Sequence, residues 1–496
     1  MTQTQHVPET LIPHTNHAAA HLGSVLVLGL GKSGKSAAAY CADLLGTRVD
    51  SLAIAAGTSS PAAEAFAQQM RDKGARVEFD HEDIQGSYDL CIASPGISQF
   101  SPFYLSAQAA CTEVVSEVEF AWRESQKGST WIAVTGTNGK TTTTSLIAHL
   151  LKEAGFNAEA VGNIGDVCLD AVAKGTVSVY VAEVSSYQLA STRLFAPQVS
   201  VILNVTPDHL SWHKGFDEYR RAKMKVLDNL PTVERGLAVL DATDDEVRAE
   251  VRRLKALGSS ERGFAYIPVG TKAGVRESMI ARCGADNAAY LDGTTLTVCF
   301  EGRQVSLVPF EDMQIRGDHN ASNALAAASA ALWVGASEED VRRGLLSFRP
   351  LAHRMEPCGT VCGKLCYNDS KGTNVDATLK AVNSMEDGRY VLMLGGCDKG
   401  TDLSDLVQAA QGARAVICFG DAGPRFADAF EEDGHVPVVR SGKLEQALDD
   451  ALAAAHPGDA VVLSPACASF DEFSCYQERG DSFKKLVEDR RSQLGA

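Results

Sequence analysis

The sequence lacks the features that mark secreted and membrane proteins. It has no apolar run near the ~20 residues that a membrane-spanning helix needs, since the longest mostly apolar helical segment covers residues 324–336. Residues 1–23 are polar and contain several histidines, without the basic-then-apolar order of a signal peptide. We therefore expect a cytoplasmic protein that does not insert into membranes, with a flexible tail over residues 1–23.

Paired cysteines are also missing. The 13 cysteines include no Cys-x-x-Cys motif and are scattered through apolar segments, as expected for small buried side chains in a reducing compartment. Cys358, Cys362 and Cys366 are spaced by four residues, which places them on one face of a predicted strand pair. A metal site at this cluster is the alternative to ordinary buried cysteines.

The sequence has no excess of positive charge. Its 63 acidic and 46 basic residues give a net charge of −17 at pH 7, which argues against a general binder of nucleic acid or of anionic membranes. With 45% hydrophobic and 22% charged residues the composition is typical of a globular protein. A chain of 496 residues is too long for one core and predicts about three domains.

The motif TGTNGKTTTT, residues 135–144, carries the clearest chemistry. It follows the apolar residues 131–134 and precedes residues 145–151, whose apolar spacing suits a helix. Strand, glycine turn and helix in this order predict a phosphate-binding loop, with Lys140 as its ammonium group and Thr141 or Thr142 as a magnesium ligand. Val134 replaces the first glycine of the common Walker loop. A Gly/Thr-rich turn is the alternative.

Before this loop, the chain opens like a nucleotide-binding unit. Residues 24–28 are apolar, residues 29–34 read GLGKSG, and Asp50 follows about twenty residues later in a second predicted strand. Residues 90–93 form another predicted strand, which ends in the turn SPGI. The glycine motif predicts a nucleotide without naming it. A glycine turn that only packs a strand against a helix is the alternative.

Two predicted strands after the phosphate loop deliver further polar residues. The apolar residues 177–182 precede Glu183, and the apolar residues 199–205 lead to His209. Both strands suit the interior of a parallel sheet, so their ends should lie beside the phosphate loop, where a carboxylate and an imidazole suit a nucleotide-bound magnesium ion. The alternative for Glu183 is a helix-capping carboxylate, and the alternative for His209 is a structural histidine.

Two other segments give weaker signals. Residues 112–124 look helical. Residues 231–309 resemble an insertion.

The third unit is predicted from the alternation of strand-like and helical segments after about residue 351. Its polar motifs DSKGTN, GGCDKG and SPACASFD each lie just beyond a strand. We therefore predict an α/β protein with three domains. They are a Rossmann-like N-terminal domain, residues 24–110; a central P-loop-type ATPase domain with a mainly parallel sheet, residues 111–350; and a Rossmann-like C-terminal domain, residues 351–496.

Together these motifs resemble the Mur ligases, the ATP-dependent amide-forming enzymes of peptidoglycan precursor synthesis. TGTNGKTTTT, EVSSYQL, TPDHL, GDHNASNALAA, LAHRMEP and NDSKGTN occur in the order typical of that family. GLGKSGKS, SPGI, DSKGTN and SPACASFDEF most resemble the members that act on UDP-N-acetylmuramoyl-L-alanine and D-glutamate. The resemblance implies these two substrates, ATP as co-substrate, two magnesium ions, a monomer and an acyl-phosphate route. It also implies that the first domain binds UDP, the second ATP and the third the amino acid.

The resemblance further implies roles for individual residues. The UDP-sugar contacts would be Gly31, Lys32, Ser33, Asp50, Ser51, Ser94, Pro95, Gly96, Asn163, Ser185, Ser186 and Gln188. The ATP contacts would be Gly136, Thr137, Asn138, Gly139, Lys140, Thr141, Thr142, Asn320, Asn323, Arg354 and Asp369. The D-glutamate contacts would be Lys371, Thr373, Lys399, Ser469, Phe470 and Tyr476. The metal ligands would be Thr141, Thr142, Glu183, His209 and Lys223. The catalytic residues would be Lys140, Glu183, His209 and Lys223, the last as a carbamate with Lys225 as a neighbouring competitor.

Two departures from the family and three other functions stay open. Ser211 stands where many relatives have aspartate, and Cys397-Asp398 shifts the polar pattern before Lys399. Another ATP-dependent peptide or folate ligase would keep the central motifs but not the C-terminal ones. A nucleotide-binding or NAD-dependent protein built on the G-x-G-x-x-G motif would leave TGTNGKTTTT unexplained. A silent regulatory paralogue should lack a phosphate-loop or metal residue, and none is missing.

Overall fold

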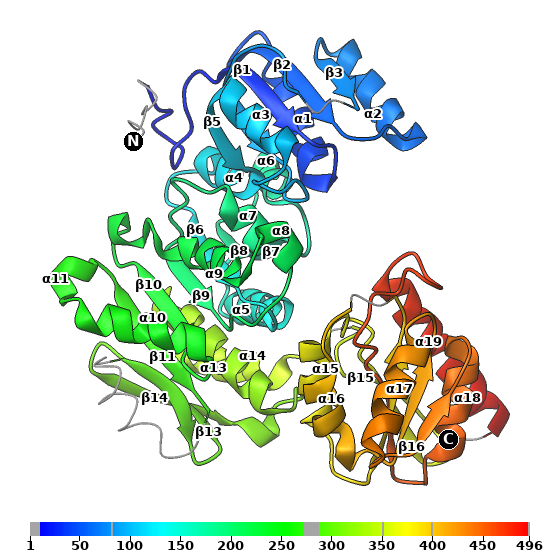
Figure 1. Ribbon diagram of the computed structural model, residues 1–496. Coiled ribbons are helices and arrows are strands. Elements are labelled where there is room, and N and C mark those ends of the chain that lie inside the picture. Colours follow the sequence, from blue (N-terminus) through cyan, green and yellow to red (C-terminus); the bar gives the residue numbers. More distant parts are fainter. Residues whose placement is uncertain (1–9, 81–82, 272–286, 350–351, 398–399, 495–496) are drawn as a thin grey trace. The chain divides into compact units, whose positions relative to one another are not determined.

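The computed structural model describes residues 10–80, 83–271, 287–349, 352–397 and 400–494. Three sheets with helices between their strands confirm the predicted α/β class (Figure 1). The chain folds into two compact units. Unit 1 comprises Met1–Met313 and Ala321–Ser347, and unit 2 comprises Gln314–Asn320 and Phe348–Ala496.

The first sheet, in unit 1, is parallel and has the order β3-β2-β1-β4-β5. Its strands are β1 (Gly23–Leu28), β2 (Val49–Ala56), β3 (Arg76–Phe79), β4 (Tyr88–Ala93) and β5 (Cys111–Ser116). Its helices are α1 (Lys32–Asp43), α2 (Pro61–Asp72), α3 (Pro102–Ala110) and α4 (Glu117–Glu124). A Cβ atom on Gly34 would lie 1.9 Å from the carbonyl oxygen of Gly29. The third glycine of GLGKSG therefore allows α1 to pack closely against β1.

The second sheet, also in unit 1, has nine strands in the order β14-β13-β12-β11-β10-β9-β6-β8-β7. Its strands are β6 (Thr130–Thr135), β7 (Ala158–Gly162), β8 (Val179–Glu183), β9 (Val199–Ile202), β10 (Leu237–Asp241), β11 (Ala265–Gly270), β12 (Ala288–Asp292), β13 (Thr295–Phe300) and β14 (Arg303–Pro309). Pairing is parallel from β7 to β12 and antiparallel in β12-β13-β14. The described part of residues 231–309, expected to be an insertion, therefore extends the sheet.

The helices of this region belong to unit 1, except that the first residues of α13, Asp318 to Asn320, fall in unit 2. They are α5 (Lys140–Glu153), α6 (Cys168–Lys174), α7 (Ser186–Ala190), α8 (Leu210–His213), α9 (Phe216–Met224), α10 (Asp245–Ala256), α11 (Ser259–Arg262), α13 (Asp318–Trp333) and α14 (Glu338–Ser347). Trp131, Ile132, Ala133 and Val134 of β6 are fully buried. This continuous apolar run is typical of a central parallel strand.

The third sheet lies in unit 2 and has the order β15-β16-β20-β17-β18-β19. Its strands are β15 (Glu356–Val361), β16 (Lys364–Asn368), β17 (Tyr390–Gly395), β18 (Ala415–Phe419), β19 (Val438–Arg440) and β20 (Ala460–Leu463). Its helices are α15 (Val375–Val382), α16 (Ser404–Ala409), α17 (Gly423–Asp433), α18 (Leu444–Ala454) and α19 (Tyr476–Leu494). Only the β15-β16 pair is antiparallel among its described strands.

Two local expectations need revision. Residues 112–124 are not one helix, because residues 111–116 form β5 and α4 begins at Glu117. Part of the expected flexible tail is held in place: the N–H groups of Asn16 and His17 donate to Ser125 and Arg123 carbonyls, and Ala18 is buried. Residues 1–9 lie outside the described residues.

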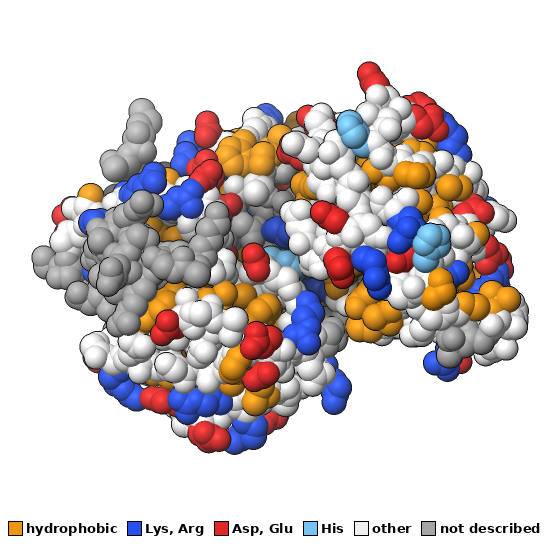
Figure 2. Space-filling view, turned by 90° about the horizontal axis from the view of Figure 1, so that it is seen from below, with side chains coloured by type: hydrophobic (Ala, Val, Ile, Leu, Met, Phe, Trp, Pro, Cys, Tyr) orange, Lys and Arg blue, Asp and Glu red, His pale blue; other side chains and the backbone are white. Residues whose placement is uncertain are grey.

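The surface and the helices add two observations. On the face shown in Figure 2, the described Lys and Arg side chains alternate with Asp and Glu rather than forming one continuous basic surface. Within the described part of the chain, no helix is both long and apolar enough to cross a membrane.

Glu117, in the first turn of α4, is a buried acidic residue. It is 1% exposed; its Oε1 accepts from the Leu169 N–H at 2.7 Å, and its Oε2 has no hydrogen-bond partner among the described atoms. Burial, which the Leu169 N–H opposes and Asp170 reinforces, raises the pKa of Glu117 to about 7. The folded state therefore binds this proton more tightly than the unfolded chain does.

We predict that Glu117→Gln stabilises the protein in a pH-dependent way. Because the folded pKa is raised, the wild type loses stability as pH rises from about 4.5 to about 7. The glutamine cannot ionise, so at pH 8 its free energy of unfolding should exceed that of the wild type by up to about 3 kcal/mol. At pH 5 most of this gain should vanish. Urea denaturation of both proteins at the two pH values measures their free energies of unfolding. An equal difference at both pH values would contradict a raised pKa at Glu117.

Candidate active site

The phosphate loop joins β6 to α5 in unit 1, as the sequence predicts. Gly139 caps α5 with φ of +82°, which a residue with a Cβ atom rarely adopts. The Lys140 ammonium donates to the carbonyl oxygens of Gly136 at 2.9 Å and Thr137 at 2.8 Å. The loop and its lysine therefore form one cradle at a helix N-terminus, the geometry that binds phosphate.

Two residues outside the predicted set hold this loop. Asn204, just beyond β9, accepts from the Asn138 N–H at 2.8 Å and donates to the Asn138 carbonyl at 3.1 Å. The Tyr219 hydroxyl lies 2.8 Å from Thr137 Oγ1 and is buried with it. Asn204 lies two residues before the TPDH motif, so its position near the end of a predicted strand is the feature of the sequence that could have identified it. Nothing in the sequence marked Tyr219 except its position one helical turn before Lys223.

Glu183 ends β8 next to the loop, because β8 pairs in parallel with β6. It is 2% exposed, and its Oε1 accepts from the Asn163 side-chain amide at 2.9 Å. Its Oε2 is buried without a hydrogen-bond partner among the described atoms, as are the hydroxyls of Thr143 and Thr144 on α5. A buried carboxylate oxygen without a donor is suited to receive a cation.

Lys223 on α9 contacts the same loop. It is 2% exposed; its Nζ donates to the Gly136 carbonyl at 2.7 Å and lies 4.7 Å from the centre of the Tyr219 ring. Burial and the Lys140 charge hold the pKa of Lys223 well below its ordinary value, although Asp208 and Glu183 oppose the shift. A neutral amine is the form that adds CO₂ to give a carbamate.

Lys225, the neighbouring competitor, points elsewhere. Its Nζ donates to the carbonyls of Ala190 at 2.8 Å and Thr192 at 2.6 Å. The geometry therefore brings Lys223, rather than Lys225, to the phosphate loop.

His209 precedes α8 with a left-handed backbone, φ of +54°. Its ring is tilted against Tyr187, with centroids 4.9 Å apart, and its Nε2 lies 3.4 Å from Asp208. Ser211, the first departure noted in the sequence, is exposed on α8. Among the described residues, no three His, Cys, Asp or Glu side chains are grouped to hold a metal ion by themselves. The predicted set differs in kind, since it combines threonine, glutamate, histidine and a modified lysine. The oxygen donors Glu183 Oε2, Thr141 and Thr142 fit the preference of magnesium.

The predicted UDP-sugar residues of the second sheet serve local structure. Ser185 and Gln188 form the capping box of α7, with the Ser185 N–H donating to Gln188 Oε1 at 2.9 Å. Ser186 Oγ lies 2.9 Å from Nε2 of the buried His213. These polar atoms are thus already engaged in holding the end of β8.

The first sheet brings only part of its predicted UDP set together. Gly31, Lys32 and Ser33 start α1 beyond β1, and Ser94, Pro95 and Gly96 follow β4, the parallel neighbour of β1. Ser94 Oγ donates to the Gly29 carbonyl at 3.3 Å. The structure does not bring Asp50 and Ser51 there. Ser51 pairs with Ser24 at the start of β1, and exposed Asp50 lies 2.9 Å from His21. A count of twenty residues from the glycines reaches the beginning of β2, whereas ligands gather at strand ends.

The predicted ATP residues beyond the loop lie in both units. Asn323 is buried on α13, and its Oδ1 would be 2.6 Å from a Cβ atom on Gly139, so it borders the phosphate loop. In unit 2, Asn320 donates to the Arg316 carbonyl at 2.8 Å. Asp369 accepts from Ser464 Oγ at 2.7 Å and the Met355 N–H at 3.2 Å. Burial raises the pKa of Asp369 to about 6, and the charge of Arg354 opposes this shift.

The predicted D-glutamate residues lie on loops of unit 2. Lys371 and Thr373 follow β16, and Ser469 and Phe470 follow β20, its parallel neighbour. The Lys371 ammonium lies 5.4 Å from the centre of the Tyr476 ring, Ser469 is buried, and Phe470 is 72% exposed. Asp398 and Lys399 lie outside the described residues. Five of the six predicted residues are thus described, on loops from one edge of the sheet and at the start of α19.

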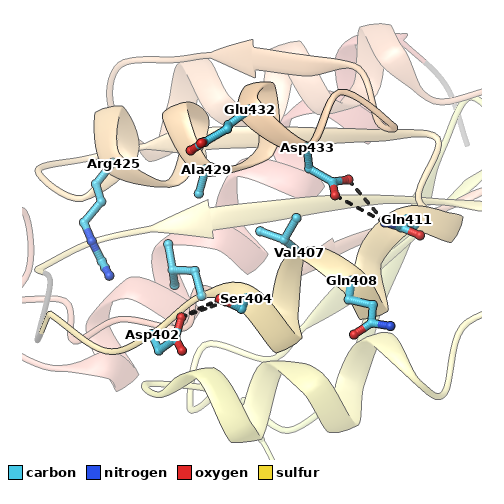
Figure 3. A pocket seen from close by; sticks show the side chains of 10 residues that line it. Asp402, Ser404, Val407, Gln408, Gln411, Arg425, Ala429, Glu432 and Asp433 are labelled. Atoms are coloured by element: carbon cyan, nitrogen blue, oxygen red, sulfur yellow. Dashed lines mark hydrogen bonds between the residues drawn. The ribbon is translucent and has the colours of Figure 1, made fainter.

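A separate groove of unit 2 lies between α16 and α17 (Figure 3). It encloses about 640 Å³. Its lining residues are Asp402, Leu403, Ser404, Val407, Gln408, Gln411, Arg425, Ala429, Glu432 and Asp433. It contains none of the predicted site residues, and Gln411 crosses it to Asp433. The chemistry therefore concentrates at the strand ends rather than in this groove.

Comparison with known proteins identifies the family. Residues 134–331 match the Mur ligase middle domain, and residues 353–467 match the Mur ligase, glutamate ligase domain. A relative from Halalkalibacterium halodurans is 35% identical over 472 residues, which cover 94% of this chain and 98% of the relative. The chain therefore belongs to the Mur ligase family.

That relative is named UDP-N-acetylmuramoylalanine--D-glutamate ligase. The same name is carried by a Thermoanaerobacter pseudethanolicus protein, 36% identical over 84% of this chain and 87% of its own. It is also carried by a Streptococcus mutans protein, 33% identical over 92% of this chain and 95% of its own.

Solved structures resemble the fold at lower identity. MurF from Acinetobacter baumannii superimposes with a TM-score of 0.56 at 19% identity, over 88% of this chain and 90% of that one. A pseudomurein peptide ligase type C from Methanothermus fervidus gives 0.55 at 16% identity, over 95% and 100%. At such identity the likeness concerns the fold alone.

We predict that Gly139→Ala weakens ATP binding by about tenfold or more, because its Cβ atom would meet Asn323 and the loop would leave its left-handed conformation. Gly155→Ala is a matched control, since Gly155 also has φ of +82° but no atom within 4 Å of its Cβ position. Its ATP affinity should stay within about twofold of the wild type. Titration calorimetry measures the ATP affinity of both variants. Equal losses of affinity would mean that backbone strain, rather than the contact with Asn323, weakens binding.

Proposed function

We propose that this chain is an ADP-forming ligase that joins D-glutamate to UDP-N-acetylmuramoyl-L-alanine, in cytoplasmic peptidoglycan precursor synthesis and as a monomer. One observation carries the proposal: Lys140, Glu183 and Lys223 converge on one phosphate loop. The name of the relatives supplies the substrates.

The chemistry of amide formation explains why such a cluster is useful. A carboxylate is a poor electrophile, so an oxygen of the L-alanine carboxylate first attacks the γ-phosphorus of ATP, and the bond to ADP breaks. The amine of D-glutamate then attacks the carbonyl carbon of the acyl phosphate, loses a proton, and phosphate leaves. Both steps place negative charge on oxygen atoms.

In this proposal the phosphate loop binds and orients ATP. Lys140 and the loop N–H groups offset charge on the transferring phosphoryl group, and Asn323 approaches the nucleotide beside Gly139. Magnesium ions, when bound, would neutralise phosphate oxygens, with ligands drawn from Thr141 or Thr142, Glu183, His209 and Lys223 as a carbamate. Asn320, Arg354 and Asp369 are proposed as the remaining nucleotide contacts.

The other two substrates are assigned to the remaining sheets. We propose that residues 24–110 bind the UDP moiety at the N-terminus of α1 and at the turn after β4. Residues 111–350 would form the ATP-binding domain. Residues 351–496 would bind D-glutamate, with Lys371 and Lys399 neutralising its carboxylates and Thr373, Ser469, Phe470 and Tyr476 completing the subsite.

The amino-acid preference tests the proposal directly. With UDP-N-acetylmuramoyl-L-alanine, ATP and magnesium present, D-glutamate should stimulate phosphate release, whereas L-alanine, L-lysine and diaminopimelate should not. Omission of the UDP-sugar should abolish the D-glutamate effect. Stimulation by a different amino acid would instead favour another ligase of this family, and no stimulation by any of them would refute the function.

We predict that Lys140→Ala lowers kcat by about 10²–10³, because one preorganised cation at a transferring phosphoryl group has that effect. Circular dichroism should show an unchanged fold. Lys152→Ala, at an exposed position in the last turn of the same helix, is the control and should retain activity. Near-normal phosphate release by folded Lys140→Ala would contradict the assignment.

A further inference from the structure

Arg479, on α19, is a deeply buried arginine of unit 2, with 1% of its surface exposed. It lies between the two loops that carry the proposed D-glutamate contacts. The loop after β16 holds Ser370, next to Lys371, and the loop after β20 holds Cys467 and Ala468, next to Ser469. The guanidinium contacts both.

Four hydrogen bonds connect Arg479 to these loops. Its Nε donates to Ser370 Oγ at 2.9 Å and its Nη2 to the Ser370 carbonyl at 2.9 Å. Its Nη2 also donates to the Cys467 carbonyl at 3.0 Å, and its Nη1 to the Ala468 carbonyl at 3.2 Å. Ser370 Oγ in turn donates to the Tyr476 carbonyl at 2.8 Å. A guanidinium has five donors in a planar fork and can make all four of these bonds, whereas a lysine ammonium has only three donors.

A third loop meets the same point. The Ala468 carbonyl also accepts from the Cys397 N–H at 2.8 Å. A Cβ atom on Gly396 would lie 2.2 Å from that carbonyl oxygen and 2.9 Å from Arg479 Nη1. Glycine at this position therefore leaves room for the arginine, and the loops after β16, β17 and β20 converge on one guanidinium.

The acceptors of Arg479 are all neutral. No carboxylate forms an ion pair with it among the described residues, so its charge is buried without a direct counter-ion. Burial accordingly lowers the pKa of Arg479 to about 10, and the charge of Asp471 opposes the shift. A buried cation without a direct ion pair is costly to a fold. This free-energy cost is expected at a site where a positive charge and rigid loops help to bind an anionic ligand.

The loop after β20 needs such support. Ala466 has a left-handed backbone, with φ of +58°. This conformation is strained for a residue with a Cβ atom and persists only when its surroundings hold it. The hydrogen bonds from Arg479 to the next two residues provide that hold.

We propose that Arg479 is a positioning residue for the amino-acid subsite: it fixes the loops of Lys371 and Ser469 at the spacing that a dicarboxylic amino acid requires. The inference rests on the proposed function, since it takes D-glutamate as the ligand of this subsite. It concerns affinity for the amino acid rather than the reactions of ATP.

The test compares Arg479→Lys with Arg491→Lys. Arg491 lies on the same helix and pairs at the surface with Glu488. Lysine keeps the charge at position 479 but loses the fork, so the KM for D-glutamate should rise about tenfold or more. The KM values for ATP and UDP-N-acetylmuramoyl-L-alanine should stay within about twofold, as should all values of Arg491→Lys.

The outcomes distinguish a failure of the positioning role from a failure of the proposed function. An unchanged D-glutamate KM in folded Arg479→Lys, or a parallel rise of all three KM values, would overturn the positioning role. Absence of D-glutamate-dependent phosphate release in the wild type would refute the proposed function instead. Should Arg479→Lys not fold, Ser370→Ala decides. It removes one acceptor and should raise only the D-glutamate KM, by about threefold; no rise would overturn the role.

Discussion

The parallel pairing of β6 with β8 on one side and β9 on the other is the constraint on which the site depends. The carboxyl ends of parallel strands all lie at the same edge of the sheet. The phosphate loop, Glu183 and Asn204 are therefore neighbours, although up to 68 residues of sequence separate them. Four consecutive residues of β6 are fully buried, so the strand that leads into the phosphate loop is held within the core. Side chains on α9 and α13 then complete the site from outside the sheet.

Charge at this edge is arranged for a ligand rather than for the protein alone. The Lys140 ammonium and the Lys223 amine both donate to the Gly136 carbonyl, so two lysines share one acceptor. Glu183 is close enough to influence Lys223, yet it leaves one oxygen without a donor among the described atoms. Phosphate oxygens would accept from the Lys140 ammonium, and a magnesium ion would bind the carboxylate. Arg479 in unit 2 is likewise a buried basic side chain, and all its hydrogen-bond acceptors are neutral.

The sequence predicts the fold class and the phosphate loop because these depend on local order: an apolar strand, glycines, then a helix. Asp50 shows where such reasoning fails, since a residue count does not say at which end of a strand a residue lies. Residues 112–116 look helical in the sequence, yet this segment contains β-branched Thr112, Val114 and Val115 and pairs with β4. Tyr219 and Arg479 could not be found from local pattern, because their partners lie far away in the sequence and only tertiary packing brings them together.

Tyr219 links the phosphate loop to α9 twice, through its hydroxyl at Thr137 and through its ring beneath Lys223. Loop and helix are thereby ordered together before any ligand arrives. The conformational entropy that a glycine-containing loop would otherwise lose upon binding has already been lost during folding. Part of the affinity for a triphosphate is thus determined by an aromatic residue of α9 that lies outside the predicted set of phosphate contacts.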